Sequence, residues 1–220
     1  MSTALAQSAQ GLSDEAYIMK PETKALAVKS VTGSELEAVL PDLARLRIIV
    51  FRDWPYLYDG SLAYEQEYLA KFAAAKGAVC VVAYDRREIV GASTGAPMIE
   101  HADEFGDPFK ASGYDISKIF YCGESVLLQS HRGFGLGHAF FDGREAQARK
   151  LGGFTHSTFC RVVRPDDHPL RPKDYVPLDG FWKKRGYAPV DGLVASYNWK
   201  DIDQPEETAH EMQFWMRELT

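Results

Sequence analysis

The sequence predicts a single α/β domain built around a mixed sheet, and three observations support this prediction. A length of 220 residues with 45% hydrophobic content suits one domain that buries a sizeable core. The predicted strands and helices follow one another in the order β-α-α-β-β-β-α-β-α-β, which is typical of an α/β fold. No internal repeat or linker interrupts them. These features exclude disordered, collagen-like and fibrous proteins.

The first half of the chain combines both hydrophobic periodicities. Alternating apolar and polar residues indicate strands, whereas apolar residues three and four apart indicate helices. The first helix must end before Pro55, because the residue preceding a proline is pushed away from helical angles. In chain order the predicted elements are a strand (24–31), two helices (34 to before Trp54, and 61–76) and a hairpin of two strands (78–85 and 88–97).

The second half continues with strands separated by loops and two further helices. A long loop covers 100–117 and a proline-rich loop covers 164–177. The regular elements between and after them are strands at 119–128, 154–163 and 193–200, a helix at 138–151 and a short helix at 178–185.

The two ends differ in composition from the domain, which we place at residues 23–200. Residues 1–22 are polar and predict a disordered lead. Residues 201–220 form an acidic tail in which Phe214-Trp215-Met216 stand at helical spacing from Met212 and Leu219. The tail could be an amphipathic helix that docks on the domain, or on a second subunit of a homodimer. Simple surface packing is the alternative.

Cysteine usage and hydropathy indicate a cytoplasmic protein. Cys80, Cys122 and Cys160 are odd in number and far apart, which favours buried free thiols over a disulfide framework. The N-terminus has no basic region followed by an apolar run, so we expect no secretory signal. No run approaches the roughly 18 apolar residues of a membrane-spanning helix. We therefore expect no membrane partner.

The charge is distributed unevenly along the chain. The net charge is −6, yet residues 132–187 carry eleven basic and six acidic residues, a net charge of +5. Such a stretch could bind an anion, or it could be a solvated basic face. It is also the one feature that supports nucleic-acid binding, which we do not expect.

A glycine-rich loop opens this basic stretch and directly follows a predicted strand. It consists of Arg132-Gly133-Phe134-Gly135-Leu136-Gly137 and leads into a helix. Glycines let successive backbone N–H groups converge on an anion, and the helix adds its positive dipole end. The pattern favours phosphate binding, with a plain tight turn as the alternative. It lacks the Gly-Lys-Ser/Thr of a P-loop and the G-x-G-x-x-G of dinucleotide-binding folds.

These residues resemble the GCN5-related N-acetyltransferase (GNAT) superfamily, whose acetyl-CoA signature is Q/R-x-x-G-x-G/A. The segment from Phe181 to Tyr187 is similar to the family's late helix ending, and the order of elements agrees from about residue 24 to 200. The resemblance implies a GNAT-like single domain of the α/β class (α+β by some schemes). Its central sheet would be mixed, mostly antiparallel and twisted, with helices on both faces and a splayed fourth strand.

The resemblance also implies acetyl transfer from acetyl-CoA, a co-substrate, to a primary amine in a ternary complex. The pantetheine arm would lie along the fourth strand at Val126, Leu127 and Leu128, where an N–H would polarise the thioester carbonyl. The pyrophosphate would bind at the loop and helix start, namely Arg132, Gly133, Phe134, Gly135, Leu136, Gly137 and His138.

Glu124, acting through water, is the candidate general base, because a protonated amine cannot attack and many family members place a carboxylate there. The alternative is an ion-paired glutamate at a strand end. Trp182 occupies the position of the tyrosine that protonates the departing thiolate in many family members. Tyr175 is our candidate for that role, Tyr121 could also take it, or the thiolate could leave unassisted.

An aromatic loop between the first two helices is the candidate acceptor site. Its rings could hold a small cationic or aromatic amine, or could simply cover the edge of the core. The residues assigned to the substrate are Phe51, Trp54, Tyr56 and Tyr58. His156 and His168 have no ligand spacing, so no metal is expected.

The sequence thus predicts an acetyl-CoA-dependent N-acetyltransferase with a small-molecule amine acceptor. Two alternatives stay open: a protein acetyltransferase acting on lysines or N-termini, and a non-catalytic acyl-CoA-binding or sensor module.

Overall fold

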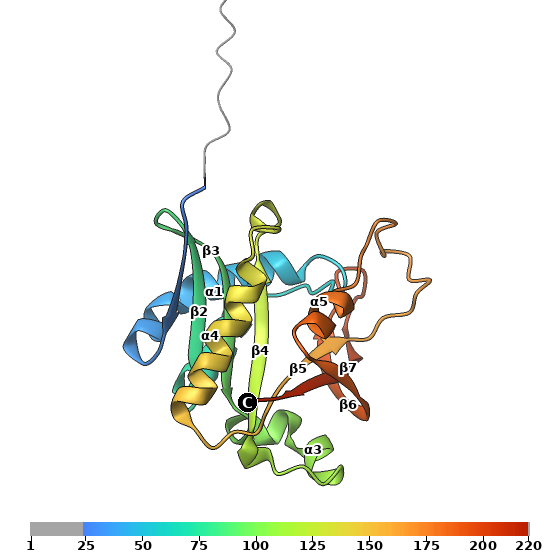
Figure 1. Ribbon diagram of the computed structural model, residues 1–220. Helices are drawn as coiled ribbons and strands as arrows, with labels where there is room; N and C mark the ends of the chain where they lie inside the picture. The colour runs from blue at the N-terminus through green and yellow to red at the C-terminus, as the bar shows by residue number, and fades with distance from the viewer. Residues whose placement is uncertain (1–23, 220) are drawn as a thin grey trace, which may run out of the picture.

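A seven-stranded sheet forms the centre of the molecule (Figure 1). The computed structural model describes residues 24–219, apart from the side chains of residues 103 and 104, so the predicted lead lies outside the described residues. The strand order is β1-β2-β3-β4-β5-β7-β6. The strands are β1 (Leu26–Val31), β2 (Val79–Asp85), β3 (Glu88–Pro97), β4 (Ile119–Leu127), β5 (His156–Val162), β6 (Ala188–Lys200) and β7 (Glu207–Glu218).

The sheet opens in its middle, between β4 and β5. These neighbours run parallel, whereas every other pair is antiparallel. They pair only from Ile119 to Tyr121, opposite His156 to Thr158, and then diverge. Figure 1 shows the two halves of the sheet separating above this point. The predicted mixed, mostly antiparallel sheet with a splayed fourth strand is confirmed.

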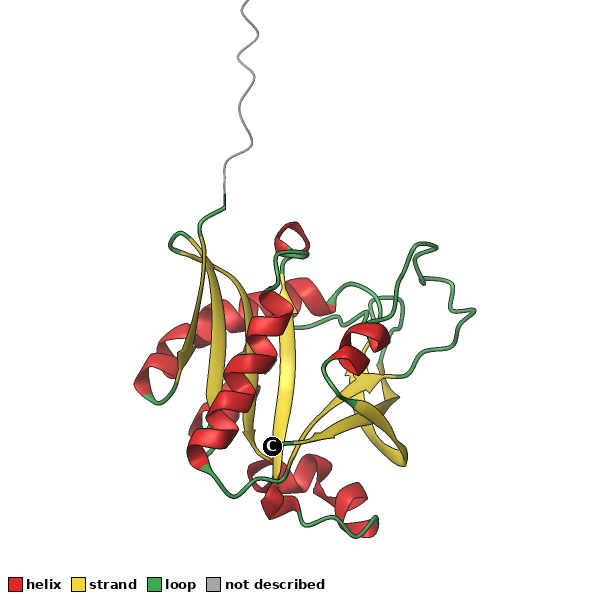
Figure 2. Ribbon diagram, in the orientation of Figure 1, coloured by secondary structure: helices red, strands yellow, loops and turns green. Residues whose placement is uncertain are grey.

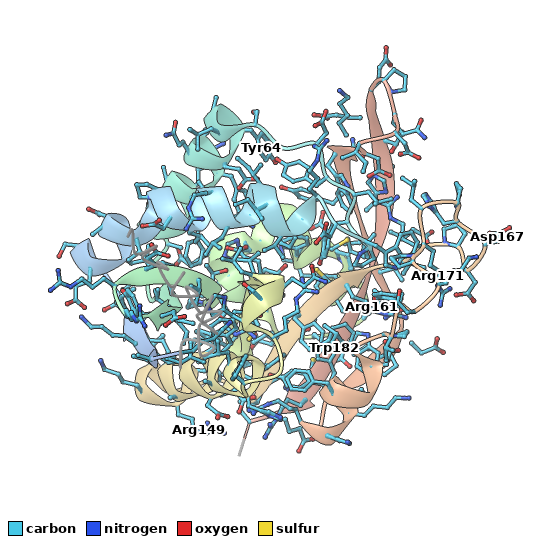
Figure 3. The ribbon with its side chains drawn as sticks, turned by 90° about the horizontal axis from the view of Figure 1, so that it is seen from above. Tyr64, Arg149, Arg161, Asp167, Arg171 and Trp182 are labelled. Carbon is cyan, nitrogen blue, oxygen red and sulfur yellow. The ribbon has the colours of Figure 1, made fainter. Side chains whose placement is uncertain are left out.

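Helices cover both faces, as Figures 2 and 3 show. α1 (Ser34–Phe51) and α2 (Leu62–Ala74) lie on one face, while α4 (Leu136–Leu151) and α5 (Asp179–Lys184) lie on the other. α1 buries Leu36, Leu43 and Leu46 at helical spacing. Burying such a side chain stabilises the fold by roughly 1.5–3 kcal/mol, which fixes this face of α1 against the sheet.

The loop predicted at 100–117 contains short helical turns, including α3 (Asp107–Ala111). Phe109 of α3 is fully buried and contacts Phe214 of β7 edge-on, with ring centroids 4.8 Å apart. This segment therefore closes the lower end of the second half of the core.

The acidic tail is not a docked helix, so that prediction is wrong. Residues 207–218 form β7, which lies between β5 and β6 and pairs with both. His210, Met212 and Phe214 alternate as buried residues, and the backbone finds hydrogen-bond partners on both sides. The apolar residues of this segment are spaced in a way that also suits a helix, but pairing with the two neighbouring strands makes it a strand. The domain extends to residue 218 rather than ending at 200, and β6 begins five residues before the predicted strand.

Cys80 and Cys122 are buried free thiols, as predicted, and Cys160 is half-buried. Among the described helices, none is both long and apolar enough to cross a bilayer.

Candidate active site

A β-bulge turns Glu124 toward one face of the sheet at the opening between β4 and β5. Ser93 pairs with Ser125 and Gly95 with Cys122, so Gly123 and Glu124 together oppose Thr94. The extra residue re-aims the side chains that follow it. A Cβ on Gly123 would lie only 2.6 Å from Thr94 Oγ1, which explains the glycine.

Glu124 lines a pocket, and one of its two carboxylate oxygens is held by a salt bridge while the other is buried without a partner in the described part of the chain. Its Oε2 accepts a hydrogen bond from Nη1 of Arg47 on α1 at 2.6 Å, while Nε of Arg47 pairs with Glu65 of α2. Burial disfavours the charge on Arg47, but the carboxylates of Glu124 and Glu65, together with Tyr68, outweigh it and raise the pKa. The other oxygen of Glu124 has no hydrogen-bond partner among the described residues. The ion-pair interpretation of Glu124 is therefore correct, and it leaves a carboxylate oxygen available.

The pocket beside Glu124 has a volume of about 100 Å³. Phe51, Tyr56 and Tyr58 line it, as the sequence predicts. Trp54 does not line it. Its ring lies 5.1 Å from His168 and 6.0 Å from Tyr175, because the loop turns this side chain toward the proline-rich segment. Trp54 therefore supports the loop from outside.

The two candidate proton donors lie in different places. Tyr175 is half-buried against Trp54 and is not among the residues that line the pocket. Tyr121 lines the pocket, and its hydroxyl lies 3.4 Å from Sγ of Cys160 on β5. Burial raises the pKa of both phenols, so both stay protonated at neutral pH.

Trp182 packs between Phe159 and Trp215, with ring centroids 5.0 and 5.2 Å away. Figure 3 shows it on α5, on the opposite side of the sheet from Tyr64 of α2. The residue at the family's tyrosine position is thus partly buried against the core here.

The glycine-rich loop, residues 132–137, is called the cradle below, after the anion that the sequence predicts it to bind. Gly133 and Gly135 adopt φ angles of +85° and +80°, in the region where side chains are strained. Gly135 precedes α4 directly. The N–H groups of residues 133–137 donate to no backbone carbonyl among the described residues. These donors and the N-terminus of α4 favour a negatively charged ligand.

The side chains of the loop frame this cradle. Arg132 and Phe134 are exposed, whereas Leu136 anchors the helix start in the core. His138 stacks edge-on against Phe181 at 4.8 Å and approaches Arg185. A Cβ on Gly137 would meet the same Phe181 ring at 3.4 Å, so the glycine lets α5 approach α4.

The backbone of β4 identifies which N–H faces the opening. Leu128 donates its N–H to Val90 of β3 at 3.0 Å, and Val126 pairs with Ala92 on the same side. Because bonding alternates along an antiparallel strand, the N–H of Leu127 points away from β3, toward the diverging β5.

Sequence reasoning missed the charged pair behind the pocket, Arg47 and Glu65. Both occupy core-facing positions: Arg47 follows Leu43 by four residues, and Glu65 precedes Leu69 by four. Opposite charges at core positions of consecutive helices indicate a buried ion pair, and this signal was present in the sequence. Tyr197 and Trp199 of β6 also line the pocket, but no local pattern places them there. Residues 24–219 contain no group of three or more His, Cys, Asp or Glu side chains able to hold a metal ion.

No protein-family model and no curated protein matches the sequence. The fold and the site define an α/β protein whose sheet opens between β4 and β5, with a glycine-rich loop after β4 and a pocket lined by Glu124. The chain has the fold of the GNAT acetyltransferases. Over 89% of its length it resembles a GNAT-family acetyltransferase from Streptococcus pneumoniae, at a TM-score of 0.52, 11% identity and 99% coverage of that chain.

Two further solved structures have the same fold. Ribosomal-protein-alanine N-acetyltransferase from Brucella melitensis gives a TM-score of 0.57 at 13% identity, covering 88% of this chain and 99% of that one. NAA60 from Arabidopsis thaliana, solved with acetyl-CoA, gives 0.57 at 12% identity, covering 89% and 99%.

Proposed function

We propose that this protein transfers an acetyl group from acetyl-CoA to a primary amine of a small molecule. The observation that carries the proposal is the opening between β4 and β5. β4 diverges from β5 after Tyr121, and this part of β4 carries Glu124, which lines the pocket and has one carboxylate oxygen that is unpartnered within residues 24–219. The glycine-rich loop follows the end of β4, and the N–H groups of residues 133–137 donate to no backbone carbonyl among the described residues. An anionic ligand at the loop and an amine at Glu124 would suit these two sets of groups. The resemblance to solved acetyltransferases supports the same assignment.

The residues present fit coenzyme A. The cradle from Gly133 to Gly137 and the exposed Arg132 suit a pyrophosphate, and the free edge of β4 suits an extended amide-bearing arm. When bound, acetyl-CoA supplies an acetyl thioester, whose carbonyl the N–H of Leu127 is oriented to polarise.

Glu124 acts as the base in this scheme. It accepts a proton from the incoming amine, while Arg47 holds its other oxygen in place. Between the two tyrosines, we assign the hydrogen bond to the departing sulfur to Tyr121, because it lines the pocket and Tyr175 does not.

We favour a small acceptor over a protein because aromatic rings form most of the pocket lining, although the Brucella neighbour is a ribosomal-protein-alanine N-acetyltransferase by name. A cavity of about 100 Å³ accommodates a group of side-chain size.

Release of free CoA thiol on mixing the protein with acetyl-CoA and an amine panel tests the proposal. Glu124→Gln should slow release on the order of 10²-fold while coenzyme A still binds. Tight coenzyme A binding with no thiol release from any small amine, peptide or protein would instead identify a sensor module.

A further inference from the structure

The free oxygen of Glu124 is an unfilled hydrogen-bond acceptor inside the pocket wall. Glu124 is 8% exposed, and its Oε1 finds no partner among the described residues. Buried carboxylate oxygens are normally satisfied, because removing them from water is costly. The position therefore suits a donor that arrives with the ligand.

The charges around this oxygen indicate which charge the hydrogen-bond donor of the ligand should carry. Arg47 serves two carboxylates, with Nε directed to Glu65 and Nη1 to Glu124. The three buried side chains therefore carry a formal charge of −1. Burial raises the pKa of Tyr56, Tyr58 and Tyr121, so these phenols stay neutral and leave that charge unchanged. Arg144 of α4 is also buried and donates to the backbone carbonyl of Glu124, but it does not line the pocket. Among Arg47, Glu65 and Glu124, the carboxylates therefore outnumber the cations by one.

Aromatic rings make up most of the remaining wall. Ring faces attract organic cations and also provide apolar area. Among the lining residues, Glu124 contributes the carboxylate, and none is Asn, Gln, Ser or Thr. The rings belong to Phe51, Tyr56, Tyr58, Tyr64, Tyr68, Phe105, Tyr121, Tyr197 and Trp199.

We propose that the acceptor is a monoamine with an aromatic or apolar body, which binds as its ammonium ion directly to Oε1 of Glu124. This inference rests on the proposed function above. A diamine would bury a second cation, and the described lining holds no second carboxylate to pair with it. The composition of the pocket therefore selects for one charge and one apolar body.

Direct binding also defines the proton transfers. The ammonium gives one proton to Glu124, which becomes the neutral acid, and the freed nitrogen bonds to the thioester carbonyl carbon. The C–S bond breaks and the sulfur leaves with its electron pair. The attacking nitrogen loses a second proton, which neutralises the thiolate, and Glu124 returns its proton to solvent.

Calorimetry on the full chain saturated with coenzyme A tests this binding mode. The ligands are phenethylamine, the uncharged phenethyl alcohol, 1,4-diaminobutane and a lysine-containing peptide. Phenethylamine should bind roughly 10- to 100-fold more tightly than the alcohol. That ratio should fall close to one in Glu124→Gln, while the alcohol's affinity stays the same and shows that the pocket is intact. Glu67→Gln, an exposed carboxylate on α2 paired with Lys71, is the matched control and should keep the full ratio.

Stronger binding of the diamine or the peptide would overturn the inference, as would an unchanged ratio in Glu124→Gln. If acetyl groups were transferred only to diamines or peptides, the proposed substrate class would be wrong, while the proposed acetyltransferase function would stand. Charge-selective phenethylamine binding without any transfer would refute the proposed function and retain the ligand class.

Discussion

Arg164 and Asp201 form a two-pronged salt bridge that fastens the aromatic loop to the β6–β7 hairpin. Nη1 and Nη2 of Arg164 lie 2.6 and 2.8 Å from the two carboxylate oxygens. The same guanidinium donates to the carbonyls of Pro55 and Tyr56 at 2.8 and 2.6 Å. Trp199 Nε1 also donates to the Tyr56 carbonyl. One buried cation thus holds one wall of the acceptor pocket.

Arg164→Met should lower the free energy of unfolding by about 3–5 kcal/mol, because it removes the guanidinium from the buried Asp201 and leaves it with the His210 ring at 3.4 Å. It should also weaken amine binding while coenzyme A affinity stays the same, since the glycine loop shares none of these contacts. Urea unfolding and calorimetry measure the two effects. Arg171→Gln is the control: its bridge to the exposed Asp166 should contribute at most about 1 kcal/mol. Equal effects of the two substitutions would contradict the role of Arg164.

His210 should make the same hairpin sensitive to acid. Burial lowers the pKa of His210, and Arg164 adds to this, while Asp201 and a contact with the Trp199 carbonyl oppose it. The unfolded chain therefore binds a proton first as the pH falls below the ordinary histidine value of about 6.5. Stability should fall from there toward the lower native pKa and be fully present above 6.5. Unfolding titrations between pH 7 and 5 should show a shallower loss in His210→Gln; an identical slope would exclude His210 as the titrating group.

Gly135 offers a matched pair of substitutions for the cradle. A Cβ there meets no atom within 4 Å, so charge and backbone angle determine the outcome. Gly135→Asp places a carboxylate where phosphate is expected and should abolish coenzyme A binding. Gly135→Asn has nearly the same shape, tolerates the left-handed φ and carries no charge, so it should retain most of the affinity. Equal coenzyme A affinities in the two variants would contradict phosphate binding at the glycine-rich loop.

The β-bulge predicts a coupling between Gly123 and Thr94. Gly123→Ala should destabilise the protein by about 1–3 kcal/mol, because its methyl group meets Thr94 Oγ1. Thr94→Ala removes that oxygen, so the double variant should recover part of the loss. A double-mutant cycle of unfolding free energies measures the coupling. Additive effects would show that the two residues do not clash.

Local signals made much of this structure predictable. The strand, glycine loop and helix around Gly135 are contiguous in sequence, so the order of these elements was predictable before the fold was known. The same holds for the place of Phe51, Tyr56 and Tyr58 in the pocket lining, because these residues lie close together in sequence at and after the end of α1. The direction of Trp54 depends on contacts with residues more than 100 positions away, which no local pattern encodes. β7 was not predicted for a similar reason. Its backbone pairs with β5 and β6, whereas the predicted helix would have bonded to itself from turn to turn.

The position of β7 has a consequence for how the protein is made. β6 pairs with β7 alone, and β7 follows it in the chain. A nascent chain can therefore complete the half of the sheet from β1 to β4 while β6 still lacks its neighbour. Tyr197 and Trp199 reach their places only once β7 has been synthesised and inserted beside β5. During translation the glycine-rich loop can thus be assembled before Tyr197 and Trp199 complete the lining of the pocket.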